Sequence, residues 1–82
     1  MIQAFIMVNV ETGSEENVLK HLKTLDNIKE AYVSYGVYDL IVKVKADNME
    51  DLKEAVTRKI RSINEVESTL TLVMTEEATN PE

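Results

Sequence analysis

The chain has 82 residues, of which 44% are hydrophobic and 5% aromatic, with one histidine and no cysteine. This length allows one small domain, and the few aromatic residues imply an aliphatic core. Such a domain is only marginally stable, and without cysteine neither disulfides nor thiolate zinc sites can reinforce it. Association is the remaining common means of reinforcement, so we expect an oligomer. The single histidine disfavours a transition-metal site, and we expect no cofactor. The net charge of −6 disfavours direct nucleic-acid binding, which depends on clustered basic residues.

Neither the basic residues nor the N-terminus indicates a nucleic-acid or membrane partner. The only candidate basic patch contains Arg58, Lys59 and Arg61, and three such charges on one helix more often form a solvated surface. Residues 1–4 lack the positive charges of a signal peptide, and no apolar run approaches the length of a membrane span. Together with the missing cysteines, these features predict a cytoplasmic protein with no membrane partner.

The first predicted elements are a strand over residues 2–10 and a helix over 15–25. The strand alternates, and its less apolar face carries Gln3, Phe5, Met7 and Asn9, so both faces of the sheet are expected to be covered. Ser14, followed by an acidic first turn, is the expected N-cap of the helix. His21 lies at the edge of the helix's apolar stripe, where a lone histidine is more often structural or solvated than catalytic.

The middle of the chain predicts an antiparallel hairpin. Two strands, 28–35 and 38–45, are separated by Gly36 and Val37. Lys43 and Lys45 alternate with aliphatic residues of the second strand, which favours a partly exposed or edge strand.

A second helix is predicted over 48–62 and a last strand over 67–74. The helix follows the capping pattern from Asp47 to Glu50, and Lys59 lies close enough to its apolar stripe for its stem to reach the rim of the core. We assign residues 1–75 to one domain and 76–82 to an acidic, frayed tail.

This order of elements predicts a ferredoxin-like α+β fold, βαββαβ, with a four-stranded antiparallel sheet and two helices on one face. The other face would be open in a monomer, and a second copy is its simplest cover. The expected homodimer interface comprises Phe5, Met7, Ile41 and Val73.

Two features fall outside the core pattern. Asp39 begins a strand in which aspartate is disfavoured, and it either caps the turn through its own backbone or binds a cation. Thr69 and Thr71 either pack on the solvent side of the last strand or offer hydroxyls to a ligand. Hydroxyls, a carboxylate and a turn with free backbone N–H groups suit a zwitterionic amino acid.

The sequence resembles the C-terminal ligand-sensing (RAM) domain of the Lrp/AsnC, or feast/famine, transcription regulators, and especially its stand-alone versions. The resemblance covers nearly the whole chain and depends on the order and spacing of short segments: 4–8, Gly13, 28–32, 36–40 and 66–71.

This resemblance implies a dimeric α+β barrel, further assembly of dimers, up to an octamer of four dimers, and an amino-acid effector bound between dimers. Backbone N–H groups near Gly36 would bind the effector carboxylate, and Asp39 would bind its ammonium. The other expected ligand-binding residues are Val37, Tyr38, Thr69 and Thr71, although Tyr38 can equally serve the subunit contact. A partner would be a full-length Lrp/AsnC regulator, whose activity the chain would modulate without binding DNA itself, since no helix-turn-helix precedes the first strand.

Two points remain open from the sequence. Tyr35 occupies a position where the family more often has a smaller residue such as Thr, which leaves the cleft size and the effector open. The alternative function is a small dimeric α+β barrel enzyme of monooxygenase or isomerase type, with His21 or Asp39 as the acid–base group. The sequence shows no paired titratable groups for that chemistry, so we expect a non-enzyme. An amino-acid-binding ACT domain is a further neighbour in topology and ligand class.

Overall fold

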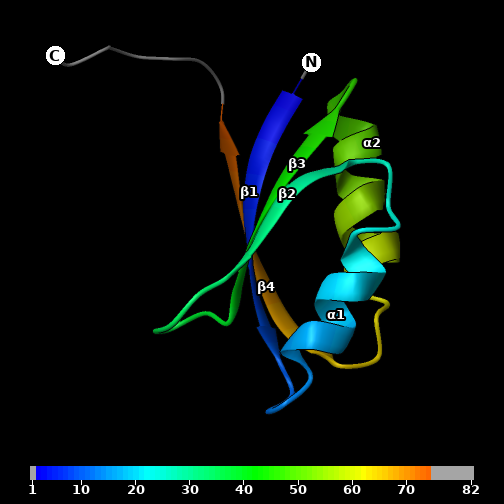
Figure 1. Cartoon of the computed structure of the whole chain (residues 1–82). Helices are drawn as coiled ribbons and strands as arrows, with labels where there is room; N and C mark the ends of the chain where they lie inside the picture. The colour runs from blue at the N-terminus through cyan, green and yellow to red at the C-terminus, as the bar shows by residue number, and fades with distance from the viewer. Residues whose placement is uncertain (1, 75–82) are drawn as a thin grey trace, which may run out of the picture.

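A computed structural model describes residues 2–74 of the chain (Figure 1). Its elements follow in the order β1 (Ile2–Val10), α1 (Glu15–Leu22), β2 (Ile28–Val33), β3 (Leu40–Ala46), α2 (Met49–Glu54), η1 (Ala55–Ile60) and β4 (Val66–Met74). The predicted acidic tail lies outside the described residues.

The four strands form one antiparallel sheet in the order β2-β3-β1-β4, and both helices cover the same face of it (Figure 1). The predicted ferredoxin-like α+β fold is therefore confirmed. The sheet is open, with β2 and β4 at its edges, so closure into a barrel would require a second copy. Of the two alternatives predicted for β3, the partly exposed strand is confirmed, since Lys43 and Lys45 are half-buried, and the edge strand is wrong, because β3 lies between β2 and β1.

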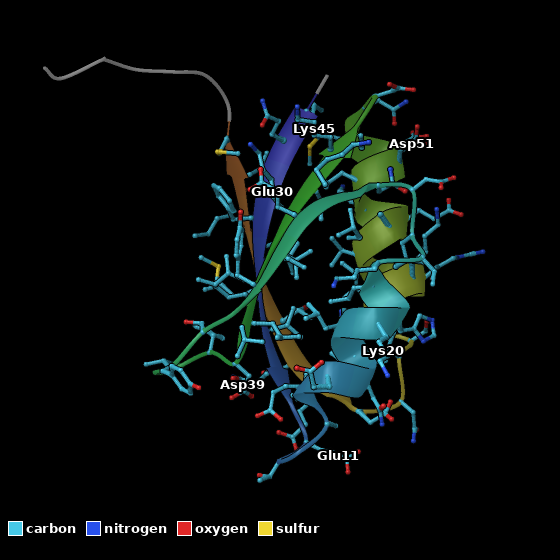
Figure 2. All side chains as sticks on the ribbon, in the orientation of Figure 1. Glu11, Lys20, Glu30, Asp39, Lys45 and Asp51 are labelled. Carbon is cyan, nitrogen blue, oxygen red and sulfur yellow. The ribbon has the colours of Figure 1, made fainter. Side chains whose placement is uncertain are left out.

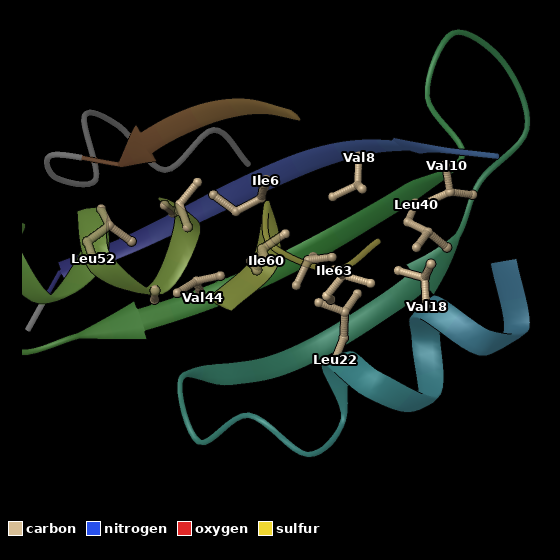
Figure 3. Close-up of a cluster of buried hydrophobic side chains, with 14 of the residues drawn as sticks. Ile6, Val8, Val10, Val18, Leu22, Leu40, Val44, Leu52, Ile60 and Ile63 are labelled. Atoms are coloured by element: carbon tan, nitrogen blue, oxygen red, sulfur yellow. The ribbon is translucent and has the colours of Figure 1, made fainter. Parts of the chain in front are cut away.

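The core fills the space between the sheet and the helices (Figure 3). Alternate residues of β1 and β3 point into it, as the period-two pattern predicts, and α1 contributes Val18 and Leu22 while α2 and η1 contribute Leu52 and Ile60. These four helical side chains are at most 1% exposed. Burying a side chain of this kind contributes about 1.5–3 kcal/mol, so aliphatic packing is the main source of stability.

Ser14 occupies the predicted N-cap position of α1 but lacks a capping bond, whereas the predicted cap Asp47 is replaced by Asn48. Ser14 precedes α1 but makes no side-chain cap, because its hydroxyl donates to the carbonyl of Glu11 at 2.5 Å. At the second helix the cap is Asn48 rather than Asp47, and its side-chain oxygen accepts the backbone N–H of Asp51 at 2.8 Å.

The predicted helices also end or change earlier than their apolar stripes suggest. α1 ends at Leu22, and the chain continues in a tighter turn in which the N–H of Leu25 donates to the carbonyl of Leu22 at 3.0 Å. The second helix is α-helical only in α2, and η1 is π-helical, as the bond from the Arg61 N–H to the Val56 carbonyl at 2.9 Å indicates. The second helix thus changes type at Ala55 without a break.

The loop between β2 and β3 is longer than the predicted two-residue turn. It spans residues 34–39 and extends away from the helices (Figure 1). Its ends are tied by the N–H of Ser34, which donates to the carbonyl of Asp39 at 2.8 Å.

The face without helices, which we call the helix-free face, is defined by the strand register. Because residues opposite each other in a ladder point to the same side, one row across the sheet consists of Tyr32, Ile41, Met7 and Leu70. The next row consists of Glu30, Lys43, Phe5 and Leu72. Phe5, Met7 and Ile41 therefore lie on the predicted face.

The placement of Val73 on that face is wrong. Val73 pairs with Ala4, whose side chain is fully buried on the helix side. The two faces of β4 are both partly apolar, so alternation alone could not assign them. Leu70 and Leu72, at 44% and 48% exposure, lie on the helix-free face instead.

Candidate functional site

The β2–β3 loop is an exposed polar segment with an unusual backbone at its centre. Gly36 has φ +137°, in the region that favours glycine, and no atom lies within 4 Å of where a Cβ would stand. Its neighbours Tyr35 and Val37 are 98% and 83% exposed, whereas Tyr38 and Asp39 are half-buried. The backbone around Gly36 and the side chains of Tyr35 and Val37 are therefore accessible at this end of the sheet.

Asp39 has a structural role in joining the loop to β1. Its carboxylate Oδ2 accepts the backbone N–H of Val10 at 2.9 Å, and its own N–H donates to the carbonyl of Val8 at 3.0 Å. The carboxylate thus bonds a neighbouring strand rather than its own turn, which explains an aspartate at this position. An ionised carboxylate has about four acceptor sites, so the bond to Val10 leaves capacity for a further donor.

Thr69 and Thr71 lie on the helix side of β4, opposite Val8 and Ile6 of β1. There they line a groove of about 400 Å³ between β4 and the second helix. We call it the cationic groove, and its lining residues are Met49, Leu52, Lys53, Val56, Thr57, Arg61, Thr69, Thr71 and Val73.

The structure thus brings the two threonines together but keeps them apart from the loop. The loop extends on the side away from the helices, and Asp39 lies beside it at the end of the sheet, away from α2 (Figure 2). None of residues 34–39 lines the cationic groove. In one copy the loop and the cationic groove are therefore two separate features.

Several groove residues were not among the candidates found from the sequence. Lys53, Val56 and Arg61 recur at helical spacing, but so do core and solvated residues, and in the sequence Arg61 is part only of the candidate basic patch. Their common position becomes visible only once the second helix is packed beside β4.

A polar cluster lies on the helix-free face. The Tyr32 hydroxyl donates to Glu30, whose other oxygen lies 3.6 Å from Nζ of Lys43. The Tyr32 hydrogen bond, aided by Lys43, holds the pKa of Glu30 below its ordinary value, and the same bond raises the pKa of Tyr32. Asp39 lies at the loop end of the sheet, away from this cluster (Figure 2).

The residues suggested for acid–base chemistry do not form a site. His21 is exposed on α1, and within residues 2–74 neither His21 nor Asp39 lines either of the two grooves. Lys59, expected at the rim of the core, is exposed and donates to the side-chain oxygen of Asn27 at 3.1 Å. Over the same described part of the chain, no cluster of His, Cys, Asp or Glu could hold a metal ion. No helix there is long and apolar enough to cross a membrane.

Comparison with known proteins places this geometry in context. Residues 3–81 match the family model described as the Lrp/AsnC ligand binding domain. The regulatory protein AsnC of Haemophilus influenzae is 36% identical over 70 residues, covering 84% of this chain and 47% of that protein. The chain therefore spans about half the length of the curated relatives it matches.

Two solved structures are similar over nearly the whole chain. The hypothetical protein PHS023 from Pyrococcus horikoshii has a TM-score of 0.87 and 42% identity, and the match covers 95% of this chain and 94% of that one. The structure of Escherichia coli AsnC has a TM-score of 0.89 and 27% identity, and the match covers 99% of this chain and 55% of that one.

Proposed function

The chain belongs to the Lrp/AsnC ligand-binding domain family of transcription regulators, and from this premise we propose that it is a non-catalytic sensor that binds an amino acid between copies of itself and couples that binding to assembly. The observation that supports the proposal is that the loop of residues 36–39 does not line the groove that contains Thr69 and Thr71. In the proposed site, the loop of one copy and the two threonines of another would bind one ligand. A ligand at such a junction stabilises the assembled state by its higher affinity for that state.

The loop has the chemistry to bind the backbone of an amino acid. N–H groups around Gly36 and Val37 would bind the α-carboxylate, and the acceptor sites of Asp39 not used by Val10 would bind the ammonium. Tyr38 would border the ligand or the contact between copies. Thr69 and Thr71 of the neighbouring copy would complete the site.

The helix-free face would carry the first level of assembly. Its apolar rows contain Phe5, Met7 and Ile41, extended to the sheet edge by Leu70 and Leu72. Two such open sheets, packed face to face in a homodimer, would form an α+β barrel and cover apolar surface that is costly to expose. The carboxylates and lysines at the rim would then stay in contact with water.

Further association of dimers, up to an octamer, would bring loops and grooves of different dimers together. Since curated regulators contain a similar domain, a full-length Lrp/AsnC regulator would be a second partner, held through the same surfaces. We propose that the chain acts there, in the cytoplasm, as one domain of residues 1–75 that modulates the regulator without itself contacting DNA.

Calorimetric titration with each of the twenty amino acids, combined with light scattering, tests the effector role. We expect binding of at least one amino acid and a change in molar mass that accompanies it. Asp39→Asn should weaken binding while Asp47→Asn, an exposed control, should not. Thermal unfolding of both variants separates loss of the ligand contact from loss of the bond to Val10. The absence of heat and of mass change with all twenty would refute the effector role.

Met7→Glu tests the dimer. A carboxylate in the middle of the helix-free face should convert a wild-type dimer to a folded monomer, as measured by light scattering and circular dichroism. Lys20→Glu on α1 is the control and should leave the mass unchanged. A wild-type protein that is monomeric at high concentration would contradict this interface.

A further inference from the structure

The cationic groove differs in charge from the rest of the molecule. Among its nine lining residues, Lys53 and Arg61 are cationic and none is acidic, although the whole chain carries a net charge of −6. A second groove, between α2 and the α1–β2 connection, has a similar volume of about 390 Å³ and shows the contrast. Its three lysines are accompanied by four carboxylates, those of Asp26, Asp47, Asp51 and Glu54. Of these two grooves in residues 2–74, the cationic groove is the one whose charge suits an anion.

The lining of the cationic groove is layered. Leu52 and Val56, at 1% and 8% exposure, pack against the sheet and form an apolar floor. Lys53, Thr57 and Arg61 are exposed and stand at the helical side of the opening, opposite the hydroxyls of β4. The guanidinium of arginine offers a fork of N–H donors that matches a carboxylate, and threonine hydroxyls add further donors.

We propose that the cationic groove makes this sensor selective for an amino acid whose side chain ends in a carboxylate, an inference that rests on the proposed function. The methylenes of the ligand side chain lie on the apolar floor, and Arg61, with Lys53, binds the terminal carboxylate. The ammonium and α-carboxylate remain for the loop of a neighbouring copy, where Asp39 supplies the only carboxylate among residues 34–39. A basic side chain is rejected, because it would meet two cations without a counter-charge.

In this proposal each part of the assembled site binds a different part of the ligand. The loop carries one anion and free N–H groups, which suits the zwitterion common to all amino acids, and so gives no selectivity among them. The groove carries two cations and an apolar floor, which suits only one class of side chain. Selectivity therefore depends on Arg61 and Lys53, whereas affinity common to all amino acids depends on Asp39.

Glutamate and glutamine provide the sharpest test, because they have the same shape and differ in side-chain charge. In calorimetric titrations of the full chain, we expect glutamate to bind about tenfold more tightly than glutamine, as expected for hydrogen bonds to a charged group. Arg61→Gln should bring the ratio close to one, and Lys53→Gln should reduce it. Arg58→Gln, on η1 but outside the groove lining, is the matched control and should keep the ratio.

The outcomes separate this inference from the proposed function. Binding of glutamine or of aliphatic amino acids as tightly as glutamate, with a change in mass, overturns the selectivity and leaves the sensor role intact. Retention of the glutamate preference in both Arg61→Gln and Lys53→Gln also overturns it. Silence with every amino acid overturns both. Thermal unfolding of each variant within a few degrees of the wild type shows that a lost preference is not a lost fold.

Discussion

The covered and the helix-free faces of the sheet are made by the same strands, but they differ in what completes them. On the covered face, Leu40 and Val44 of β3 are fully buried because α1, α2 and η1 lie over them. On the helix-free face, Leu70 and Leu72 of β4 are nearly half exposed. The first face is covered by helices of the chain itself, whereas no helix of residues 2–74 covers the second (Figure 1).

The difference teaches where the functional surface lies. The covered face explains why the chain folds, since its aliphatic side chains form the buried core. The helix-free face, the β2–β3 loop and the cationic groove explain what the chain can do, since each offers groups that its own fold leaves incompletely used. Evidence that either face behaves like the other would break this division.

Truncation of one leucine on each face is the most direct test and has the largest expected effect. Leu40→Ala should lower the free energy of unfolding by about 2–5 kcal/mol at every protein concentration, because it leaves a cavity in the core. This corresponds to a fall in Tm of roughly 10 °C or more for a domain of this size. Urea and thermal unfolding followed by circular dichroism measure it.

Leu72→Ala is the matched change on the helix-free face. Its cost should be below about 1 kcal/mol at dilutions where the protein is monomeric, because the side chain is already half in water. At concentrations where copies associate, the cost should rise as the second copy buries that leucine. A cost equal to that of Leu40→Ala at every concentration would show that the two faces are not different in kind.

The helix that covers the sheet provides a smaller effect. Asn48→Ala should destabilise the protein by about 1 kcal/mol, because it removes the cap of the Asp51 N–H at the start of α2. Asp47→Ala is the control and should cost only a few tenths of a kcal/mol on an exposed site. Denaturant unfolding of the two variants measures the difference in their free energies of unfolding. An equal loss in both would contradict Asn48 as the cap of α2.

The sequence predicts the covered face well because two independent periods agree there. Alternation in residues 2–10 and 38–45 and the helical spacing of Val18, Leu22 and Leu52 all point to one core, and burial rewards each of them. The family resemblance is equally robust, since it depends on residues along nearly the whole chain. Each of these signals depends on residues that are close together in the sequence, so it can be recognised without knowledge of the tertiary contacts.

What the sequence predicts poorly depends on contacts between distant residues. The face of Val73 is set by its register against Ala4, and alternation in a strand with two apolar faces does not fix it. Ser14 fits the pattern of a cap, yet its hydroxyl bonds Glu11 because the preceding turn presents that carbonyl. The cationic groove is invisible in the sequence, because Arg61 and Thr71 become neighbours only when the second helix packs beside β4. The ligand-binding role of the loop remains a prediction for the same reason.

The polar cluster on the helix-free face gives the smallest expected effect and measures how much of that face is in water. The pKa of Glu30 is lowered by the Tyr32 hydrogen bond, so this carboxylate contributes stability that is present above its ordinary pKa, near 4.5, and is lost as the pH falls through the lowered value. The pKa of Tyr32 is raised, so its contribution is present below its ordinary pKa of 10.0 and is lost as the pH rises through the raised value. The bond between them should therefore act between about pH 5 and pH 10.

Tyr32→Phe should lower Tm at pH 7 by about 1 °C or less where water screens the cluster, and the difference from wild type should shrink at pH 3. Tyr35→Phe, which is 98% exposed, is the matched control and should show no pH-dependent difference. A loss at pH 7 that grows with protein concentration would place the cluster at the edge of a contact between copies. A difference that is larger at pH 3 than at pH 7 would refute the assignment of the bond.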